Sequence, residues 1–278
     1  MVNFEYKKPR EIGEILTDTF QYIRLHYMTL GKGLLFFVMP FYVIQIALVG
    51  DMSVDIFNSM GDSEAEARAF ASMFSGKYFL SLLMSVLGTS MLSVVTFKHV
   101  QLTSNDREAD STNLIENVVQ NVLSFVALYS LIVIALFFSV FALILPAIFI
   151  GVQWSLAPAA LFIEEQGVFK ALGRSWELVK DYWWVTFGLI ILMTIITTIA
   201  TYVFVIPTTI LSVIISSIGT EEGSGVFSML YTIILGGTTV ISSMLYSIMQ
   251  IALSLHFFNL VERKEGGALR SKIENLSL

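Results

Sequence analysis

The chain has 278 residues, of which 55% are hydrophobic and only 14% are charged, and its formal net charge is −6. A soluble domain carries roughly 25% charged residues, so this deficit, concentrated in long uncharged runs, predicts a protein that crosses a membrane several times. The negative charge argues against nucleic acid as a partner, and the lack of cysteine excludes disulfides, thiolate nucleophiles and thiolate metal ligands.

The first predicted element is an amphipathic helix over residues 11–27. Its apolar side chains recur at the three- and four-residue spacings of one helix face. They are Leu16, Phe20, Ile23 and Tyr27. A helix of this kind beside a membrane span is expected to lie in the interface between lipid and water.

Six membrane spans are predicted from the uncharged runs that follow, because a span needs roughly 20 apolar residues. We expect them at residues 28–49, 78–97, 122–145, 147–163, 183–206 and within 226–258. Pro40 is predicted to kink the first span and Pro207 to end or kink the fifth, while Gly236 and Gly237 interrupt the last run. Residues 208–220 either extend the fifth span or lie in the interface.

A second amphipathic helix is predicted within residues 157–184, and it repeats the first. The pattern Leu-x-x-Thr-Phe-Gln-x-Ile-Arg-x-x-Tyr from Leu16 matches Leu-x-x-Ser-Trp-Glu-x-Val-Lys-x-x-Trp from Leu172. We therefore predict a single membrane domain over residues 1–278 that is built from repeat-like units. The units are expected at residues 11–99, 112–163 and 168–260.

Lysine and arginine are unevenly distributed along this topology. If both termini lie inside, only Arg68 and Lys77 of the 16 basic residues fall on outer segments. Basic residues accumulate on the cytoplasmic side of membrane proteins. The sequence thus predicts an all-α, polytopic protein with cytoplasmic termini and with its amphipathic helices on the cytoplasmic face.

The second amphipathic helix and the residues before it resemble a known family. The resemblance is carried by Ala157, Pro158, Glu164, Ala171, Leu172, Arg174, Ser175, Leu178 and Trp183. This order is similar to that in the membrane domain joined to some bacterial glycerophosphodiester phosphodiesterases, and in its stand-alone multi-span relatives. The resemblance implies a multi-pass protein of the bacterial inner, or cytoplasmic, membrane, and it does not imply catalysis. The motif residues expected to be structural are Pro158, Glu164, Ser175, Trp176 and Trp183.

No residue set in the sequence predicts an enzyme, a cofactor or a metal site. The histidines have no metal-ligand spacing and map to inner span ends, where interfacial placement of the ring explains them; they are His26, His99 and His256. Glu164 and Glu165 either cap the next helix and pair with Lys170 or Arg174, or form a proton or cation site.

The basic residues of the two amphipathic helices are candidates for binding lipid headgroups. They are Arg174, Lys180 and Arg24, and snorkelling of the same side chains is the competing explanation. We predict a non-catalytic accessory or scaffold protein that binds lipid headgroups or a partner, including a second copy of itself, at the cytoplasmic interface. The alternative is a permease for a small neutral or lipid-like substrate, suggested by the spans that proline and glycine interrupt.

Overall fold

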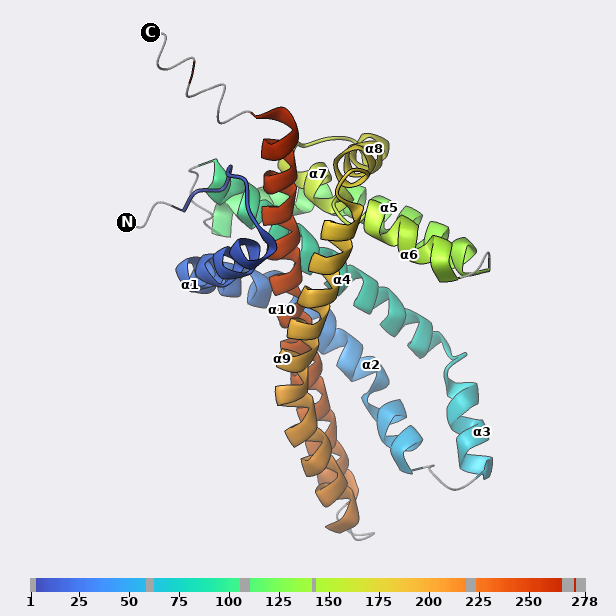
Figure 1. The fold of residues 1–278 in the computed structure, drawn as a ribbon. Coiled ribbons are helices and arrows are strands. Elements are labelled where there is room, and N and C mark those ends of the chain that lie inside the picture. The colour runs from blue at the N-terminus through green and yellow to red at the C-terminus, as the bar shows by residue number, and fades with distance from the viewer. Residues whose placement is uncertain are drawn as a thin grey trace. The chain divides into compact units, whose positions relative to one another are not determined.

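The described part of the chain is entirely helical, as the sequence predicts (Figure 1). The computed structural model describes residues 4–58, 63–105, 111–141, 144–218, 224–266 and 273. Its helices are α1 (Ile12–Phe37), α2 (Met39–Asn58), α3 (Ser63–Ser72), α4 (Gly76–Ser104), α5 (Ser111–Phe141), α6 (Ile144–Gln153), α7 (Ala157–Ile163), α8 (Val168–Val179), α9 (Trp183–Ile218) and α10 (Ser224–Glu265). Helices are expected for such uncharged runs, because each helix satisfies its own backbone polar groups.

Several of these helices are long and apolar enough to cross a membrane, as in a multi-pass membrane protein. Within the described ranges they are Gly76–Ser104, Leu145–Ile163, Trp183–Leu211 and Gly236–Glu265. A fifth span forms if Ile12–Phe37 and Met39–Val49, which meet at 43°, cross as one bent unit. This bend lies next to Pro40 and confirms the predicted kink.

The predicted number of six spans is not confirmed by this set. The third predicted span lies within α5, where the described apolar stretch is Val122–Leu136. Between the first two predicted spans the chain forms α3, in which Arg68 and Glu64 approach to 3.9 Å.

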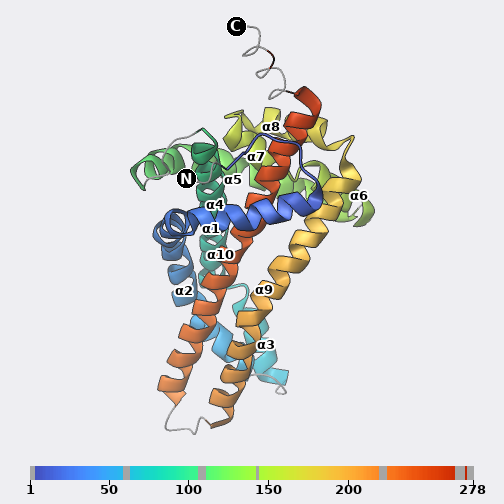
Figure 2. The same ribbon diagram turned by 60° about the vertical axis from the view of Figure 1, so that its left-hand side comes forward.

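The predicted interruption at Gly236–Gly237 is wrong, and the fifth predicted span does not end at Pro207. Both α9 and α10 run through these positions as continuous helices (Figure 2). Pro207 lacks the N–H group that would bond the carbonyl oxygen of Val203, and the helix continues without that one bond. Beyond it, the hydroxyl groups of Thr208 and Thr209 donate to the carbonyl oxygen of Val205 at 2.9 and 2.8 Å. Residues 208–218 therefore extend the fifth predicted span, while 219–220 fall outside the described residues.

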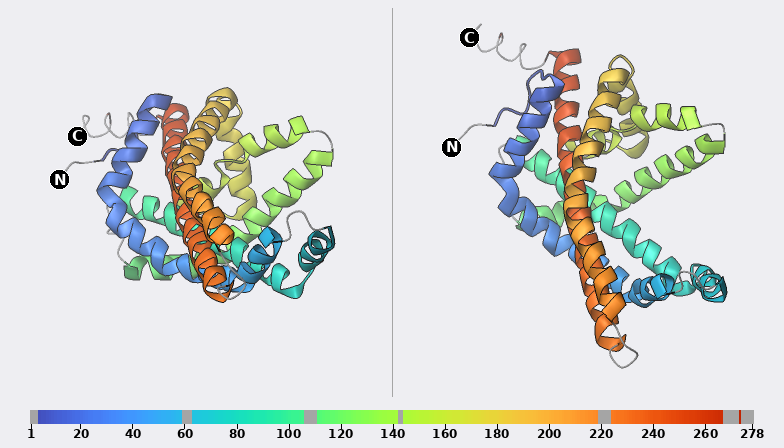
Figure 3. Two further views of the ribbon diagram at one scale, coloured as in Figure 1. Left: turned by 90° about the horizontal axis from the view of Figure 1, so that it is seen from below. Right: turned by 60° about the horizontal axis from the view of Figure 1, so that its bottom comes forward.

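The chain divides into two compact units, each built from segments that are distant in sequence. Unit 1 comprises Met1–Gly33, Ser93–Ile196 and Ser247–Leu278, and unit 2 comprises Leu34–Leu92 and Thr197–Tyr246. Within unit 1, α5 packs against α6 as the two arms of a hairpin, and α7 packs against α8 (Figure 3). The C-terminal parts of α4 and α10, Ser93–Leu102 and Gln250–Leu260, are buried in unit 1.

Unit 2 carries most of its large apolar side chains on the outside. The exposed members from α9 are Ile199, Tyr202, Val203, Phe204, Ile206, Ile210, Leu211, Val213 and Ile214. Its interior contains close contacts to glycine: a Cβ atom on Gly236 would lie only 2.7 Å from Ile46 Cδ1. Gly236 therefore serves helix packing rather than a helix break.

The two amphipathic helices expose part of their predicted apolar stripes. In α1, Phe20 and Tyr27 are 47% and 63% exposed, and in α8, Trp176 is 41% exposed, whereas Val179 of the same pattern is fully buried. The buried side chains include small polar residues. In α1 they are Ile15, Asp18, Thr19 and Tyr22, and in α8 Ala171, Ser175, Leu178 and Val179.

Candidate functional site

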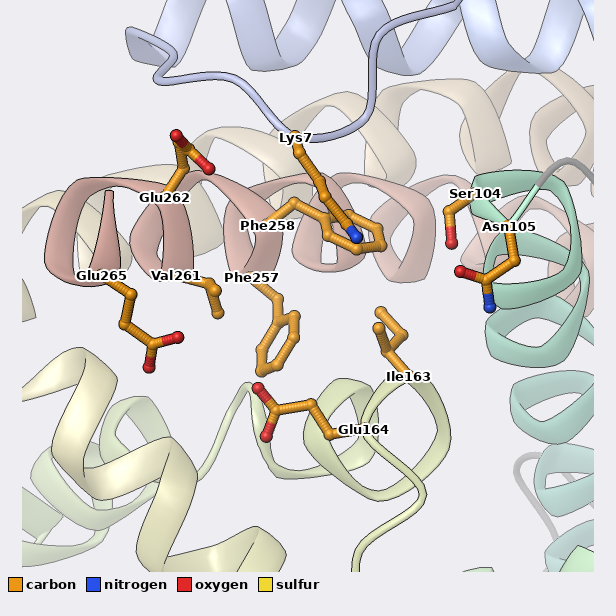
Figure 4. A pocket seen from close by; sticks show the side chains of 10 residues that line it. All are labelled: Lys7, Ser104, Asn105, Ile163, Glu164, Phe257, Phe258, Val261, Glu262 and Glu265. Carbon is orange, nitrogen blue, oxygen red and sulfur yellow. The ribbon is translucent and has the colours of Figure 1, made fainter. Parts of the chain in front are cut away.

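A pocket of about 480 Å³ lies in unit 1, where three helices that could cross a membrane reach their C-terminal ends (Figure 4). Ser104 and Asn105 contribute from the end of α4, Ile163 and Glu164 from the end of α7, and the last turns of α10 form a wall. The complete lining is Lys7, Ser104, Asn105, Ile163, Glu164, Phe257, Phe258, Val261, Glu262 and Glu265. Its volume is within the range of small-molecule sites.

The apolar lining comes mainly from two aromatic residues of α10. Phe257 and Phe258 are 1% and 4% exposed, so their rings are held by the core of unit 1. We refer to them as the phenylalanine floor. Ile163 and Val261 extend this apolar surface toward the charged groups (Figure 4).

Two carboxylates, Glu164 and Glu265, form what we call the acidic end of the pocket. Both bind the guanidinium of Arg174 on α8: Nη2 lies 2.9 Å from Glu164 Oε1 and 2.6 Å from Glu265 Oε1. The Nε atom also donates to Glu164 at 3.1 Å, which makes that pair bidentate. Burial acts to lower the pKa of Arg174, but the bonds and charges of Glu164 and Glu265 raise it above its ordinary value. Arg174 therefore stays cationic.

The other side of the pocket, which we call the basic end, contains Lys7, Ser104 and Asn105. The side chain of Lys7 extends from the segment before α1 into the pocket (Figure 4). Ser104 and Asn105 line the pocket from the end of α4. Among the described residues, Lys7 takes part in no ion pair, so its charge is available to a ligand.

A buried lysine supports the segment between α7 and α8. Lys98 of α4 is 1% exposed, and its Nζ lies 3.2 Å from Glu165 Oε1 and 2.9 Å from Gln101 Oε1. Gln101 Nε2 also donates to Glu165 Oε1, at 2.9 Å. Glu165 adopts a left-handed backbone conformation with φ of 52°, which costs free energy for any residue but glycine. The bonds to α4 hold this strained residue in place.

The segment before α1 is fastened in a comparable way. Arg10, 2% exposed, donates from Nε to Asp18 Oδ2 at 2.8 Å, and its backbone N–H donates to Asn259 Oδ1 of α10 at 2.7 Å. Lys8 pairs with the same Asp18 oxygen at 2.8 Å. The segment before α1 thus binds α10, whereas the segment before α8 binds α4.

The same histidine contact occurs twice in unit 1. His99 Nε2 lies 3.0 Å from Thr29 Oγ1, and His256 Nε2 lies 2.9 Å from Thr186 Oγ1, each pair being 70 residues apart in sequence. Both histidines are 0% exposed, so their rings lie inside the protein rather than on its surface. A helix position that faces the core accounts for these rings. The described residues contain no cluster of three ligands that could hold a metal ion.

Positions that correspond in the two matching segments meet at the pocket. Lys7 and Ile163 lie 156 positions apart, as do the starts of the two helix patterns. Ser104 and Val261 lie 157 positions apart, as do the two threonine-bonded histidines. The pocket is therefore made from equivalent parts of both segments, although the side chains at these positions differ.

The predicted headgroup-binding residues do not gather at one place. Arg174 binds the two carboxylates of the acidic end, so its charge is already paired. Lys180 and Arg24 are exposed and do not line the pocket. Of the alternatives for Glu164, pairing with Arg174 is the one that the structure contains.

The predicted motif residues lie around α7 and α8. Pro158 lies in the first turn of α7, and Ser175 Oγ donates to the carbonyl of Gln153 at 2.6 Å. The rings of Trp176 and Trp183 both lie 5.9 Å from the ring of Phe149. These contacts join α6 to α8 and α9 and give the motif a structural role.

Sequence reasoning missed Lys7, the phenylalanine floor and Glu265 as parts of one site. The three- and four-residue spacing of Phe258, Glu262 and Glu265 places them on one helix face. That spacing was the available signal. The uncharged run before Glu262 had been assigned wholly to a membrane span.

Comparison with known proteins gives a single result. Residues 24–260 match a family described as a domain of unknown function (DUF7847). No curated protein and no solved structure matches the chain.

Proposed function

Since the chain belongs to the family described as a domain of unknown function (DUF7847), we propose a function on the strength of its own residues. We propose that it is a non-catalytic accessory protein of the bacterial cytoplasmic membrane, and that it holds the headgroup of a membrane lipid in the pocket of unit 1. Its termini lie on the cytoplasmic side in this proposal. The resemblance to the membrane domain of glycerophosphodiester phosphodiesterases agrees with this but stays a prediction.

One observation carries the proposal, namely the position of the pocket along the helices. Three candidate spans end at its lining, with Ser104, Ile163 and Glu265 as their last residues. The end of a membrane span lies at the level of the lipid headgroups. A pocket there, with an apolar floor and charged ends, suits a molecule that is itself apolar on one side and charged on the other.

The basic residues on the same side of the predicted topology support this placement. With the pocket facing the cytoplasm, Arg174, Lys98 and Arg263 lie on the inner side, as positive-inside statistics favour. The exposed rings of Phe20 and Trp176 lie on the outward faces of α1 and α8. Aromatic side chains favour the membrane interface, where one part of the ring is apolar and the other is wet.

The permease alternative rested on spans that proline and glycine interrupt. The helices α9 and α10 are continuous through Pro207 and Gly236–Gly237, while the bend beside Pro40 is present. Flux of a labelled neutral solute into proteoliposomes distinguishes the two functions, because a headgroup-holding protein gives the flux of empty vesicles.

Native mass spectrometry of the protein in mild detergent tests the proposal. The wild-type chain is expected to retain one phospholipid. Val261→Phe adds volume at the pocket wall and is expected to reduce retention about tenfold, since overpacking costs typically 1–3 kcal/mol. Val185→Phe, the same substitution at a site 40% exposed on α9, is the matched control. Equal lipid retention by both variants would sink the proposal.

A further inference from the structure

The pocket is electrically polarised along its length. Glu265 lies at one side of the view and Ser104 and Asn105 at the other, with the phenylalanine floor between them (Figure 4). The amino group of Lys7 points into the space above the floor, toward the basic end. A ligand that fills this space meets carboxylates at one end and an ammonium, an amide and a hydroxyl at the other.

The acidic end carries more negative charge than its guanidinium neutralises. Arg174 is a single cation shared by Glu164 and Glu265 at 2.9 and 2.6 Å. Glu177 also approaches Arg174, at 3.8 Å, but its side chain is 63% exposed and does not line the pocket. Glu164 and Glu265 share one guanidinium, and Glu262 is a third lining carboxylate, so the lining around Arg174 carries net negative charge that would stabilise a bound cation.

The basic end suits a phosphate group. Lys7 supplies a compact positive charge and the amide of Asn105 adds a neutral N–H donor, whereas the hydroxyl hydrogen of Ser104 is donated to the carbonyl oxygen of Gln101 at 2.8 Å. A phosphodiester has a single negative charge and several acceptor oxygens, so it matches one lysine with polar neighbours.

We propose that the pocket recognises a phosphoethanolamine group, with its ammonium at the acidic end and its phosphate at the basic end. This inference rests on the proposed function and names the headgroup that the pocket prefers. A primary ammonium has three N–H donors for the carboxylates of Glu164 and Glu265. The quaternary ammonium of choline has none, and glycerol headgroups carry no cation. The pocket therefore distinguishes ethanolamine phospholipids from both.

The test is competition between lipids with matched acyl chains. The full-length protein is incubated in micelles that contain equimolar phosphatidylethanolamine, phosphatidylcholine and phosphatidylglycerol, and bound lipids are identified by native mass spectrometry. The wild-type chain is expected to retain phosphatidylethanolamine about tenfold over each of the others, the ratio for one charge-assisted hydrogen bond. O-phosphoethanolamine added in excess shows whether the headgroup alone competes.

A pair of variants isolates the acidic end. Glu265→Gln removes one of the three lining carboxylates and leaves Glu164 paired with Arg174, so the preference for phosphatidylethanolamine is expected to fall while total lipid retention persists. Glu177→Gln removes a carboxylate that touches the same guanidinium outside the pocket, and the preference is expected to be unchanged. Lys7→Met is expected to lower retention of all three lipids alike, because all three carry phosphate.

The outcomes separate the two proposals. Retained lipid without a preference for phosphatidylethanolamine overturns this inference and leaves the proposed function standing, as does equal loss of preference in the Glu265→Gln and Glu177→Gln variants. If no lipid is retained, the proposed function fails and takes the inference with it. Complete displacement of the lipid by O-phosphoethanolamine supports recognition of the phosphoethanolamine group but overturns membrane lipid as its required source.

Discussion

The two matching sequence segments around α1 and α8 contain the same ion pair with opposite signs. Lys8 precedes Asp18 by ten positions, and Glu164 precedes Arg174 by ten; the pairs lie 2.8 and 2.9 Å apart. In the first segment the cation is on the loop and the anion on the helix, and the second segment reverses them. A surface ion pair needs complementary charges but has no preference for which partner carries which sign. The two segments can therefore keep the same ion-pair geometry although the charges of the two partners are exchanged.

This divergence gives the pocket its polarity. At positions 156 residues apart, the segment before α1 contributes Lys7 to the lining and the segment before α8 contributes Ile163, followed by Glu164. Two identical repeats would surround the pocket with like charges. The different repeats place a lysine on one side and carboxylates on the other.

The largest loss of stability is expected when the helix residue of either ion pair, Asp18 or Arg174, is replaced. Asp18→Ala should destabilise the protein by about 3 kcal/mol, since it leaves the guanidinium of Arg10, whose side chain is 0% exposed, with only carbonyl partners. Arg174→Ala should cost about 2 kcal/mol, because its carboxylate partners Glu164 and Glu265 remain partly hydrated. Thermal unfolding in detergent compares the two, and a lower midpoint for Arg174→Ala would reverse the predicted order.

The next largest loss of stability is expected at Glu165, which has the left-handed backbone conformation, and its buried partner Lys98. Glu165→Ala should cost about 2 kcal/mol, because Lys98 keeps only the oxygen of Gln101 as a partner. The position that corresponds to Lys98 in the second matching segment is Leu255, 157 residues further along the chain. The double variant Glu165→Ala with Lys98→Leu should therefore recover most of the loss in unfolding midpoint. No recovery would show that Lys98 is needed for packing rather than for charge pairing.

A smaller difference is expected between the two histidine contacts. Thr186→Val should cost about 1 kcal/mol, because His256 Nδ1 has no partner and the variant leaves both ring nitrogens unpaired. Thr29→Val should cost about half as much, since His99 Nδ1 still bonds the hydroxyl of Tyr22. Unfolding midpoints measured side by side check this ratio, and equal losses would contradict it.

The smallest effect is expected at the surface pair of Asp181 and Lys264, which approach to 2.7 Å. The hydrogen bond from Lys264 lowers the pKa of Asp181 below its ordinary value of 3.8. Any stabilisation is therefore present above pH 3.8 and is lost as pH falls through the lowered pKa. Because Asp181 is fully exposed, Asp181→Asn should leave the unfolding midpoint at pH 7 unchanged. A clear shift in midpoint would show that this pair is shielded from solvent.

Local patterns in the sequence were sufficient to predict the long helices and some of the side-chain ion pairs. Uncharged runs predicted the long helices, the residues next to Pro40 bend as expected, and Glu164 pairs with Arg174. The continuity of α9 beyond Pro207 was left open by the sequence, because a proline removes only one backbone hydrogen bond and a membrane helix can continue past it. Whether it does so depends on the packing around the proline, which a pattern of apolar residues does not reveal.

The pocket itself was beyond sequence reasoning for a different reason. Lys7 and Glu265 are 258 positions apart, and nothing in local periodicity brings them together. The match between the two helix patterns indicated related segments, but it did not indicate that each pre-helix segment binds the helix of the other repeat. The bonds from Arg10 to Asn259 and from Lys98 to Glu165 are long-range contacts of that kind.

Photocrosslinking tests the central claim most directly. A phospholipid with a photoreactive group on its headgroup is incorporated with the full-length protein into nanodiscs, irradiated, and the labelled peptides are sequenced. Labelling is expected on the segment that contains Lys7 and on Phe257–Glu265 of α10, and Val261→Phe should abolish it while Val185→Phe does not. Labelling spread over exposed residues, with no loss in the Val261→Phe variant, would contradict a headgroup site in this pocket.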